Sequence, residues 1–171
     1  FKMITYIEAI SAFYPNYQVS STSNEYADIQ WGTYAPISQE ELNAKILEIT
    51  KTKKIQELSD ACECAIISGF ESSALGDAHI YDSEAVDQIN LIGSVAATEP
   101  TPASPDGYNI YYACRNVSDG TKEYHEHTHA QLRQVLEDGA QVKLGNLQTF
   151  FVKKLAVLAC TTLAEVEAIT R

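Results

Sequence analysis

A polar loop between two helix-forming segments, within Ala61–Ala97, is the feature that most limits what this chain can fold into. Before the loop, apolar residues recur at helical spacing up to Gly69, where the helix can end. After it, Asp82 or Ser83 can cap a second helix whose apolar stripe is expected to face the core. The stripe consists of Val86, Ile89, Ile92 and Gly93. The pattern predicts a helix–loop–helix core in which Glu71–Tyr81 is the loop.

The first part of the chain predicts a short helix followed by a hairpin. Isoleucines at steps of three predict a helix over Met3–Phe13, and Pro15 ends it. Aromatic and β-branched residues then predict strands over Tyr17–Ser20 and Glu25–Trp31. The dipeptide Phe1-Lys2 before Met3 resembles a remnant of expression, so Met3 is the expected natural start.

Three capping boxes, in which a hydroxyl residue precedes Glu or Gln by three positions, mark helix starts. They predict helices over Gln39 to about Phe70, Ala130–Cys160 and Leu163–Ile169. The stripe of the second of these helices, expected to be its core face, is Leu132, Val135, Val142, Leu147, Phe150, Phe151, Leu155 and Leu158. Gly139 and Gly145 disfavour the helix by about 1 kcal/mol each relative to alanine, so close packing or a bend is expected at both.

A tyrosine-rich hairpin is predicted before the last long helix. Strands over Tyr108–Cys114 and Lys122–His127 flank an Asp119-Gly120 turn. The expected fold is therefore α+β, a mainly helical core with small β-hairpins. The expected domains are an N-terminal helix-plus-hairpin module over residues 1–36 and a helical core over residues 37–171 that holds the hairpin at about 108–127.

Composition indicates a globular chain and excludes several classes of partner. The 45% apolar and 20% charged content is typical of a folded domain. A net charge of −11 argues against a nucleic-acid surface, and no apolar run reaches membrane-spanning length. No signal-peptide pattern opens the chain. The four cysteines form no C-x-x-C pair, so reduced thiols are expected.

Several segments resemble one family. Residues 66–76 (IISGFESSALG), His79-x-Tyr81 and residues 87–93 (DQINLIG) are similar to domain of unknown function 4376. The likeness continues through the strand Tyr108–Cys114, the segment His127–Gln131 and the closing residues 161–169, and covers roughly residues 50–170. Members of that family occur in tailed phages and prophages, in or beside tail-fibre genes. The N-terminal module resembles small prophage tail proteins.

The resemblance implies a bacteriophage tail protein that binds a tail-fibre or baseplate protein, as an adaptor or a fibre-assembly factor. It implies action in the bacterial host cytoplasm during assembly, with the virion tail as the other location, and allows a homo- or hetero-oligomer. Because tyrosine and tryptophan dominate protein interfaces, the expected contact residues are aromatic. They are Trp31, Tyr108, Tyr111, Tyr112 and Tyr124.

Polar residues around the loop are expected to hold it to the following helix. They are His79, Tyr81, Asp87, Gln88 and Asn90. An alternative treats Asp87 and His79 as a catalytic carboxylate–imidazole pair, with Ser72 or Ser73 as the nucleophile of a glycan hydrolase. Phosphate loops and hydrolase or metalloprotease motifs are absent, so no enzyme is expected. A glycan-binding receptor domain with aromatic side chains in a shallow groove is the other alternative.

The segment His125-Glu126-His127-Thr128-His129 is the one pattern that suggests a metal. Residues two apart on a strand share a face, so His125 and His127 together can contribute two ligands. Two ligands leave most of a coordination shell unfilled, and His129 falls beyond the strand. The segment is therefore expected to hold no metal in the monomer, and no cofactor is expected.

Overall fold

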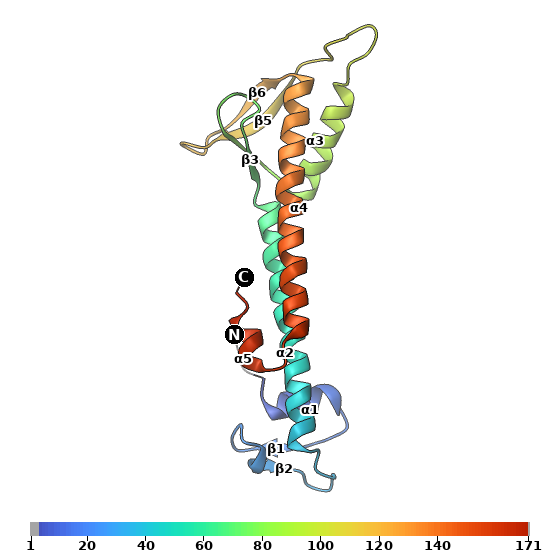
Figure 1. The fold of residues 1–171 in the computed structure, drawn as a ribbon, viewed down its shortest axis with the longest axis vertical. Coiled ribbons are helices and arrows are strands. Elements are labelled where there is room, and N and C mark those ends of the chain that lie inside the picture. Colours follow the sequence, from blue (N-terminus) through green and yellow to red (C-terminus); the bar gives the residue numbers. More distant parts are fainter. Residues whose placement is uncertain (1–3, 171) are drawn as a thin grey trace. The chain divides into compact units, whose positions relative to one another are not determined.

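The computed structural model describes residues 4–170, so the expected helix start at Met3 and the dipeptide before it lie outside the described residues. The chain divides into two compact units, residues 1–59 with 151–171 and residues 60–150. The long helices α2 (Gln39–Ile67) and α4 (His129–Ala159) contribute residues to both (Figure 1). The division differs from the boundary expected after residue 36, because continuous helices connect the units where a linker would mark a boundary.

The first unit begins with helix α1 (Tyr6–Phe13), which Thr5 and Glu8 start with a capping box. Strand β1 (Ser20–Ser21) pairs antiparallel with β2 (Ile29–Gln30), and a single 3₁₀ turn η1 (Tyr26–Asp28) precedes β2. The predicted hairpin is present, but each strand has only two residues.

Two apolar clusters hold this unit together. Ile10, Ile29, Ile37 and Leu42 form one, surrounded by partly buried tyrosines and Trp31. Ile4, Ala9 and Ile46 form the other, which Leu163 of helix α5 (Leu163–Ala168) contacts. Near the end of α4, the Lys51 ammonium donates a 2.9 Å hydrogen bond to the Leu158 carbonyl. A cation suits this position, because the last carbonyls of a helix have no partner inside it.

The second unit contains an antiparallel sheet in the order β3-β4-β5-β6. Its strands are β3 (Phe70–Ser72), β4 (His79–Tyr81), β5 (Ile110–Asn116) and β6 (Lys122–His127). The β5–β6 hairpin confirms the predicted turn and pairs six residues, from Ile110 with His127 to Arg115 with Lys122.

The predicted loop Glu71–Tyr81 is wrong in one respect, because its ends are strands β3 and β4, paired from Phe70 with Tyr81 to Ser72 with His79. Gly69 makes the change of direction after α2 possible. It has a φ of +97°, and a Cβ there would lie 2.8 Å from the Tyr81 carbonyl oxygen. Only glycine fits this left-handed, crowded position without strain.

The core of the second unit lies between the sheet and the helices α3 (Ala85–Ala97) and α4. Its buried members are Phe70, Tyr81, Leu91, Cys114, Leu132 and Val135. The predicted core stripe of α3 is wrong: Val86, Ile89 and Ile92 are 65%, 68% and 56% exposed. Leu91 is the one buried residue of α3, so the helix turns a different face to the core.

The predicted stripe of α4 also divides between core and surface. Leu132 and Val135 are buried, whereas Val142, Leu147, Phe151, Leu155 and Leu158 are exposed. All four cysteines are free thiols, of which Cys114 is buried. Within residues 4–170, none of the helices combines the length and apolar character that a bilayer crossing requires.

Candidate functional site

The strand register separates the hairpin tyrosines into an exposed group and a buried one. Tyr111 and Tyr124 lie on the outer face of the β5–β6 hairpin and are 68% and 73% exposed, and Tyr108 before the strand is 54% exposed. Tyr112 points to the opposite side of β5, where its ring lies 6.4 Å from Tyr81 and 6.1 Å from His127. Burial raises the pKa of Tyr112 to about 12. Three of the four hairpin tyrosines are therefore free to contact a partner.

Trp31, the fifth expected contact residue, belongs to the apolar cluster of the first unit. Its ring lies 6.1 Å from the ring of Tyr26 and packs against buried isoleucines. The tryptophan is only partly exposed, so its main contacts are internal.

A cleft of about 250 Å³ lies beside the exposed tyrosines. It is lined by Asp82, Asp87, Asn90, Tyr111, Tyr112, Ala113, Lys122 and Tyr124. The end of β4, the first turns of α3 and the outer hairpin thus supply one surface. It combines two exposed aromatic rings with carboxylates, an amide and an ammonium, which are the groups that orient a polar ligand in a shallow site.

Asp82 is the electrostatic centre of this cleft. Its carboxylate accepts a 2.6 Å hydrogen bond from Lys122 and another from Arg115. Burial alone would raise the pKa of Asp82, but the hydrogen bond and charge of Lys122, followed by those of Arg115, hold that pKa below its ordinary value. Asp82 therefore stays ionised and joins β4 to both strands of the hairpin, so it is unsuited to the role of a general acid.

Replacing Asp82 with asparagine is expected to destabilise the protein by roughly 1 kcal/mol at neutral pH, a modest figure because both cations are partly exposed. Since the folded pKa is depressed, the stabilisation is complete above the unfolded value near 4 and disappears as pH falls through the folded pKa. Urea unfolding at several pH values should show wild type and Asp82→Asn converging in acid. The exposed control Asp106→Asn should show no such difference, and a pH-independent gap would contradict the assignment.

The polar residues expected to form one loop-to-helix network have separate partners. The Asp87 carboxylate accepts from the Glu84 amide at 3.1 Å and so starts α3. Gln88 donates to the Ser83 carbonyl and accepts from Lys143. Asn90 is exposed at the cleft, whereas the side chain of Tyr81, the last residue of β4, is buried in the core of the second unit.

Among the described residues, no hydrogen bond or ion pair joins Asp87 to His79. Ser72 lies opposite His79 in the β3–β4 pair, but its hydroxyl has other partners. The Ser72 hydroxyl donates a 2.6 Å hydrogen bond to the Asp138 carboxylate and accepts one from the Ala74 amide. Ser72 and Ser73 line a separate cleft of about 650 Å³ whose other lining side chains include Gln131, Gln134 and Asp138. A serine nucleophile needs a hydrogen-bonded base such as histidine. Here the Ser72 hydroxyl donates to Asp138 and His79 Nδ1 faces the Asp77 carbonyl, so no hydrogen bond among the described residues links the serine to an imidazole.

The two histidines of β6 have different environments. His127 is fully buried, and its Nε2 lies 2.8 Å from the Tyr81 hydroxyl while its Nδ1 lies 2.8 Å from the His125 carbonyl. Burial lowers the pKa of His127, so the ring is neutral. The strand therefore turns His127 into the core, while His125 stays partly exposed.

His125 lies near two residues that the sequence did not connect with it, His79 and Cys114. Burial raises the pKa of the Cys114 thiol, although its hydrogen bond with Tyr81 opposes this. In the structure, Cys114 lies opposite Glu123, two residues from His125. Both residues belong to the strands predicted from the sequence, so the turn between those strands was the signal that could have found this neighbour. The proximity of His79 to His125 could not be predicted, because the strand that carries His79 was predicted as a loop.

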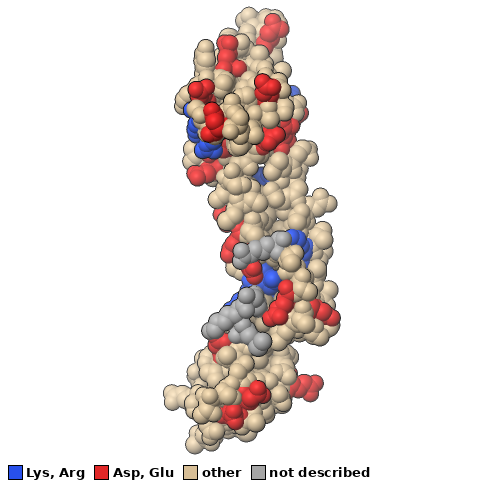
Figure 2. All heavy atoms as spheres, turned by 90° about the vertical axis from the view of Figure 1, so that its left-hand side faces the viewer, with Lys and Arg blue, Asp and Glu red and all other residues tan. Residues whose placement is uncertain are grey.

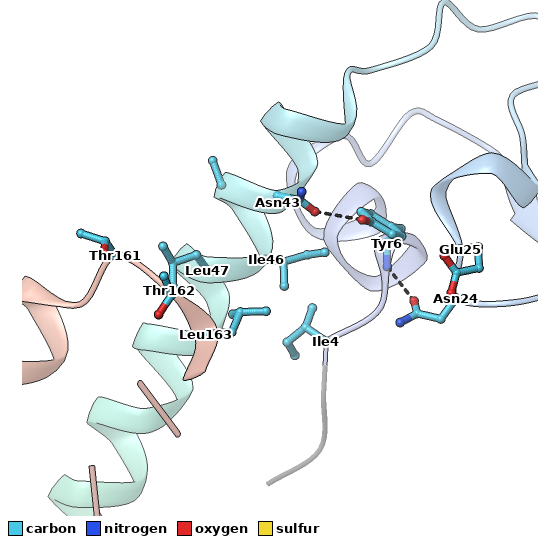
Figure 3. A pocket seen from close by; sticks show the side chains of 11 residues that line it. Ile4, Tyr6, Asn24, Glu25, Asn43, Ile46, Leu47, Thr161, Thr162 and Leu163 are labelled. Carbon is cyan, nitrogen blue, oxygen red and sulfur yellow. Dashed lines mark hydrogen bonds between the residues drawn. The ribbon is translucent and has the colours of Figure 1, made fainter. Parts of the chain in front are cut away.

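A third cleft, of about 660 Å³, lies in the first unit (Figure 3). The isoleucine and leucine side chains that line it are Ile4, which precedes α1, Ile46 and Leu47 of α2, and Leu163 of α5. Asn24, Asn43 and Tyr6 are among its polar lining residues. The Tyr6 hydroxyl donates to Asn43 at 2.9 Å, and the Tyr6 amide donates to Asn24 at 3.3 Å. None of the site residues predicted from the sequence lines this cleft.

Comparisons of the chain with models of known protein families, with curated proteins and with solved structures found no match.

Proposed function

We propose that this protein is a tail protein of a tailed phage or prophage that binds a tail-fibre or baseplate protein as an adaptor or assembly factor. The family resemblance of residues 50–170 names the class of partner. It also implies that the protein acts in the bacterial host during assembly, by stoichiometric binding and not by catalysis.

The exposed stripe of α3 is the observation that carries the proposal. Val86, Ile89 and Ile92 follow one another at steps of three, so they share one face of the helix. Each is more than half exposed, although its pattern is that of a helix face that packs against something. Rows of exposed apolar side chains, unlike single ones, are typical of surfaces that bind another protein.

The hairpin tyrosines support the same function. Tyr108, Tyr111 and Tyr124 are exposed in the same unit, and tyrosine is enriched at interfaces because a rigid ring covers much area. A specific interface buries on the order of 800 Å² on each partner. Figure 2 shows Asp and Glu side chains scattered over the face that it draws.

Co-purification with the tail proteins encoded beside this one tests the proposal. Ile89→Asp and the double change Tyr111→Ala with Tyr124→Ala are expected to weaken the complex by more than about 10-fold, as loss of central interface residues does. Arg133→Ala, an exposed change on α4, is the control and should bind normally. Circular dichroism should show all variants folded. Absence of any complex with every tail protein of the phage would refute the proposal.

A glycan-binding receptor domain is the second candidate, favoured by the cleft beside Tyr111 and Tyr124. Aromatic rings flanked by carboxylates and an amide suit the apolar face and hydroxyl edge of a sugar. Titration with host surface glycan, followed by NMR, should then shift the signals of this cleft, and Tyr124→Ala should abolish the shifts. Asp87→Asn distinguishes a hydrolase, which would lose activity while folded, from a binding protein, in which the change only weakens the start of α3.

A further inference from the structure

Three adjacent strands bring together three side chains that are typical metal ligands. His79 comes from β4, Cys114 from β5 and His125 from β6. Their ligand atoms all lie within 4.8 Å of one another. In a tetrahedral zinc site the bond lengths put a nitrogen and a sulfur roughly 3.5 Å apart, so small rotations of these side chains would complete the geometry. This is the one such cluster among residues 4–170.

His79 is already held in the orientation that a ligand needs. Its Nδ1 lies 2.9 Å from the Asp77 carbonyl oxygen, which can only accept a hydrogen bond. The proton is therefore on Nδ1, and Nε2 keeps a free lone pair. Metal-binding histidines are oriented in this way by a carbonyl or carboxylate on the second nitrogen.

His127 shows the opposite arrangement and serves as an internal comparison. Both of its nitrogens have partners, the Tyr81 hydroxyl and the His125 carbonyl. His79 and His125 instead face each other, with ring centroids 5.1 Å apart. The metal pair suggested by the sequence, His125 with His127, is thus replaced by His125 with His79.

The remaining surroundings suit an ion that arrives from solvent. Cys114 is 1% exposed, whereas the side chain of His125 is 37% exposed and gives a route inward. The Glu123 carboxylate lies 4.0 Å from His125 Nε2, near enough to become a fourth ligand or to accept a hydrogen bond from the ring. One thiolate and two imidazoles favour Zn²⁺ over Mg²⁺ or Ca²⁺, which prefer oxygen ligands.

We propose that His79, Cys114 and His125 bind one Zn²⁺ ion per chain, with the Glu123 carboxylate or a water molecule as the fourth ligand. The ion would join β4, β5 and β6 and so stabilise the sheet that carries the exposed tyrosines. The thiol proton is released to solvent on binding, because the thiolate is the ligand. The site is independent of any tail-protein partner.

Titration of tag-free, metal-free protein with Co²⁺ tests the site, because cobalt replaces zinc and absorbs visible light. One equivalent should produce the absorption of tetrahedral cobalt and a sulfur-to-cobalt charge-transfer band, and Zn²⁺ should displace it. Zn²⁺ should also raise the melting temperature. His125→Gln changes a side chain that is 37% exposed and should lower the affinity by more than about 100-fold, since changes outside the ligand shell alone reach about that size.

Two further variants identify the ligands, with matched controls. Cys114→Ser should remove the charge-transfer band, and His79→Gln should weaken binding as His125→Gln does. Cys64→Ser and His129→Gln, which change a thiol and an imidazole outside the cluster, should bind cobalt like the wild type. Folded wild-type protein that binds no stoichiometric Co²⁺ or Zn²⁺ would overturn the proposal. An unchanged affinity for Co²⁺ in the His125→Gln variant would also overturn the proposal.

Discussion

Replacing Leu132 with alanine is expected to lower the free energy of unfolding of the second unit by about 3 kcal/mol. Leu132 is fully buried and packs in the cluster that contains Phe70, Tyr81 and Leu91. The change removes apolar surface from the core and leaves a cavity between the sheet and α4, and both effects destabilise. Urea unfolding followed by hydrogen exchange at β5 and β6 measures the second unit, whereas Trp31, the only tryptophan, reports on the first.

Leu144→Ala provides the matched control on the same helix. Leu144 is 57% exposed, and alanine favours the helix at least as well as leucine. The substitution should therefore change the free energy of unfolding by no more than about 0.5 kcal/mol. A loss at Leu144 as large as that at Leu132 would contradict the assignment of the buried face of α4. The comparison therefore tests which side of this helix faces the sheet.

Gly139→Ala is expected to destabilise the protein by about 1–2 kcal/mol, although alanine is favoured over glycine in a helix by about 1 kcal/mol. A Cβ at this position would lie 2.6 Å and 2.7 Å from Cζ and Cε1 of Phe70. The Phe70 ring is buried and stacks on Tyr81 with centroids 5.8 Å apart, so it has little room to withdraw. Thermal and urea unfolding both measure the loss.

Gly145→Ala, six residues later in the same helix, should have the opposite effect. A Cβ there would meet nothing within 4 Å, so only the gain in helix propensity of about 1 kcal/mol remains. In the double variant Phe70→Leu with Gly139→Ala, leucine is smaller than phenylalanine and should relieve the clash. The effects of the two substitutions on the free energy of unfolding should therefore not be additive. Stabilisation by Gly139→Ala alone would contradict the close approach of Phe70.

The close packing expected at both glycines is thus present at Gly139, while Gly145 faces open space. In the sequence the two positions look alike, because each is a glycine inside the same predicted helix. Only the position of β3 distinguishes them, because the Phe70 ring fills the space beside Gly139. The interpretation of a helix glycine therefore depends on a neighbour distant in the chain.

Signals that act within a few residues predicted structure well. The capping boxes at Thr128 with Gln131 and Thr162 with Glu165 form, and the Asp119-Gly120 turn joins β5 to β6. These motifs depend on hydrogen bonds between residues three or four apart, so the sequence alone specifies them. The mainly helical α+β class follows from the same signals and is confirmed.

Strands β3 and β4 were not predicted, because a segment of three residues is too short to show an alternating apolar pattern. The side of α3 that faces the core was also predicted wrongly. An apolar stripe shows that a helix face is suited to burial, but it does not say whether this chain or another molecule covers it. For α3, Leu91 packs inside while Ile89 is exposed.

By itself, the sequence determined where the helices and the tyrosine hairpin lie and which class of fold they form, because those depend on contacts close along the chain. The tertiary structure alone decided which tyrosines are exposed and which residues surround Asp82. It alone also brought His79 to His125, 46 positions apart in the numbering. The reason is physical: strand pairing and register set these distances, and they depend on contacts that no local pattern records.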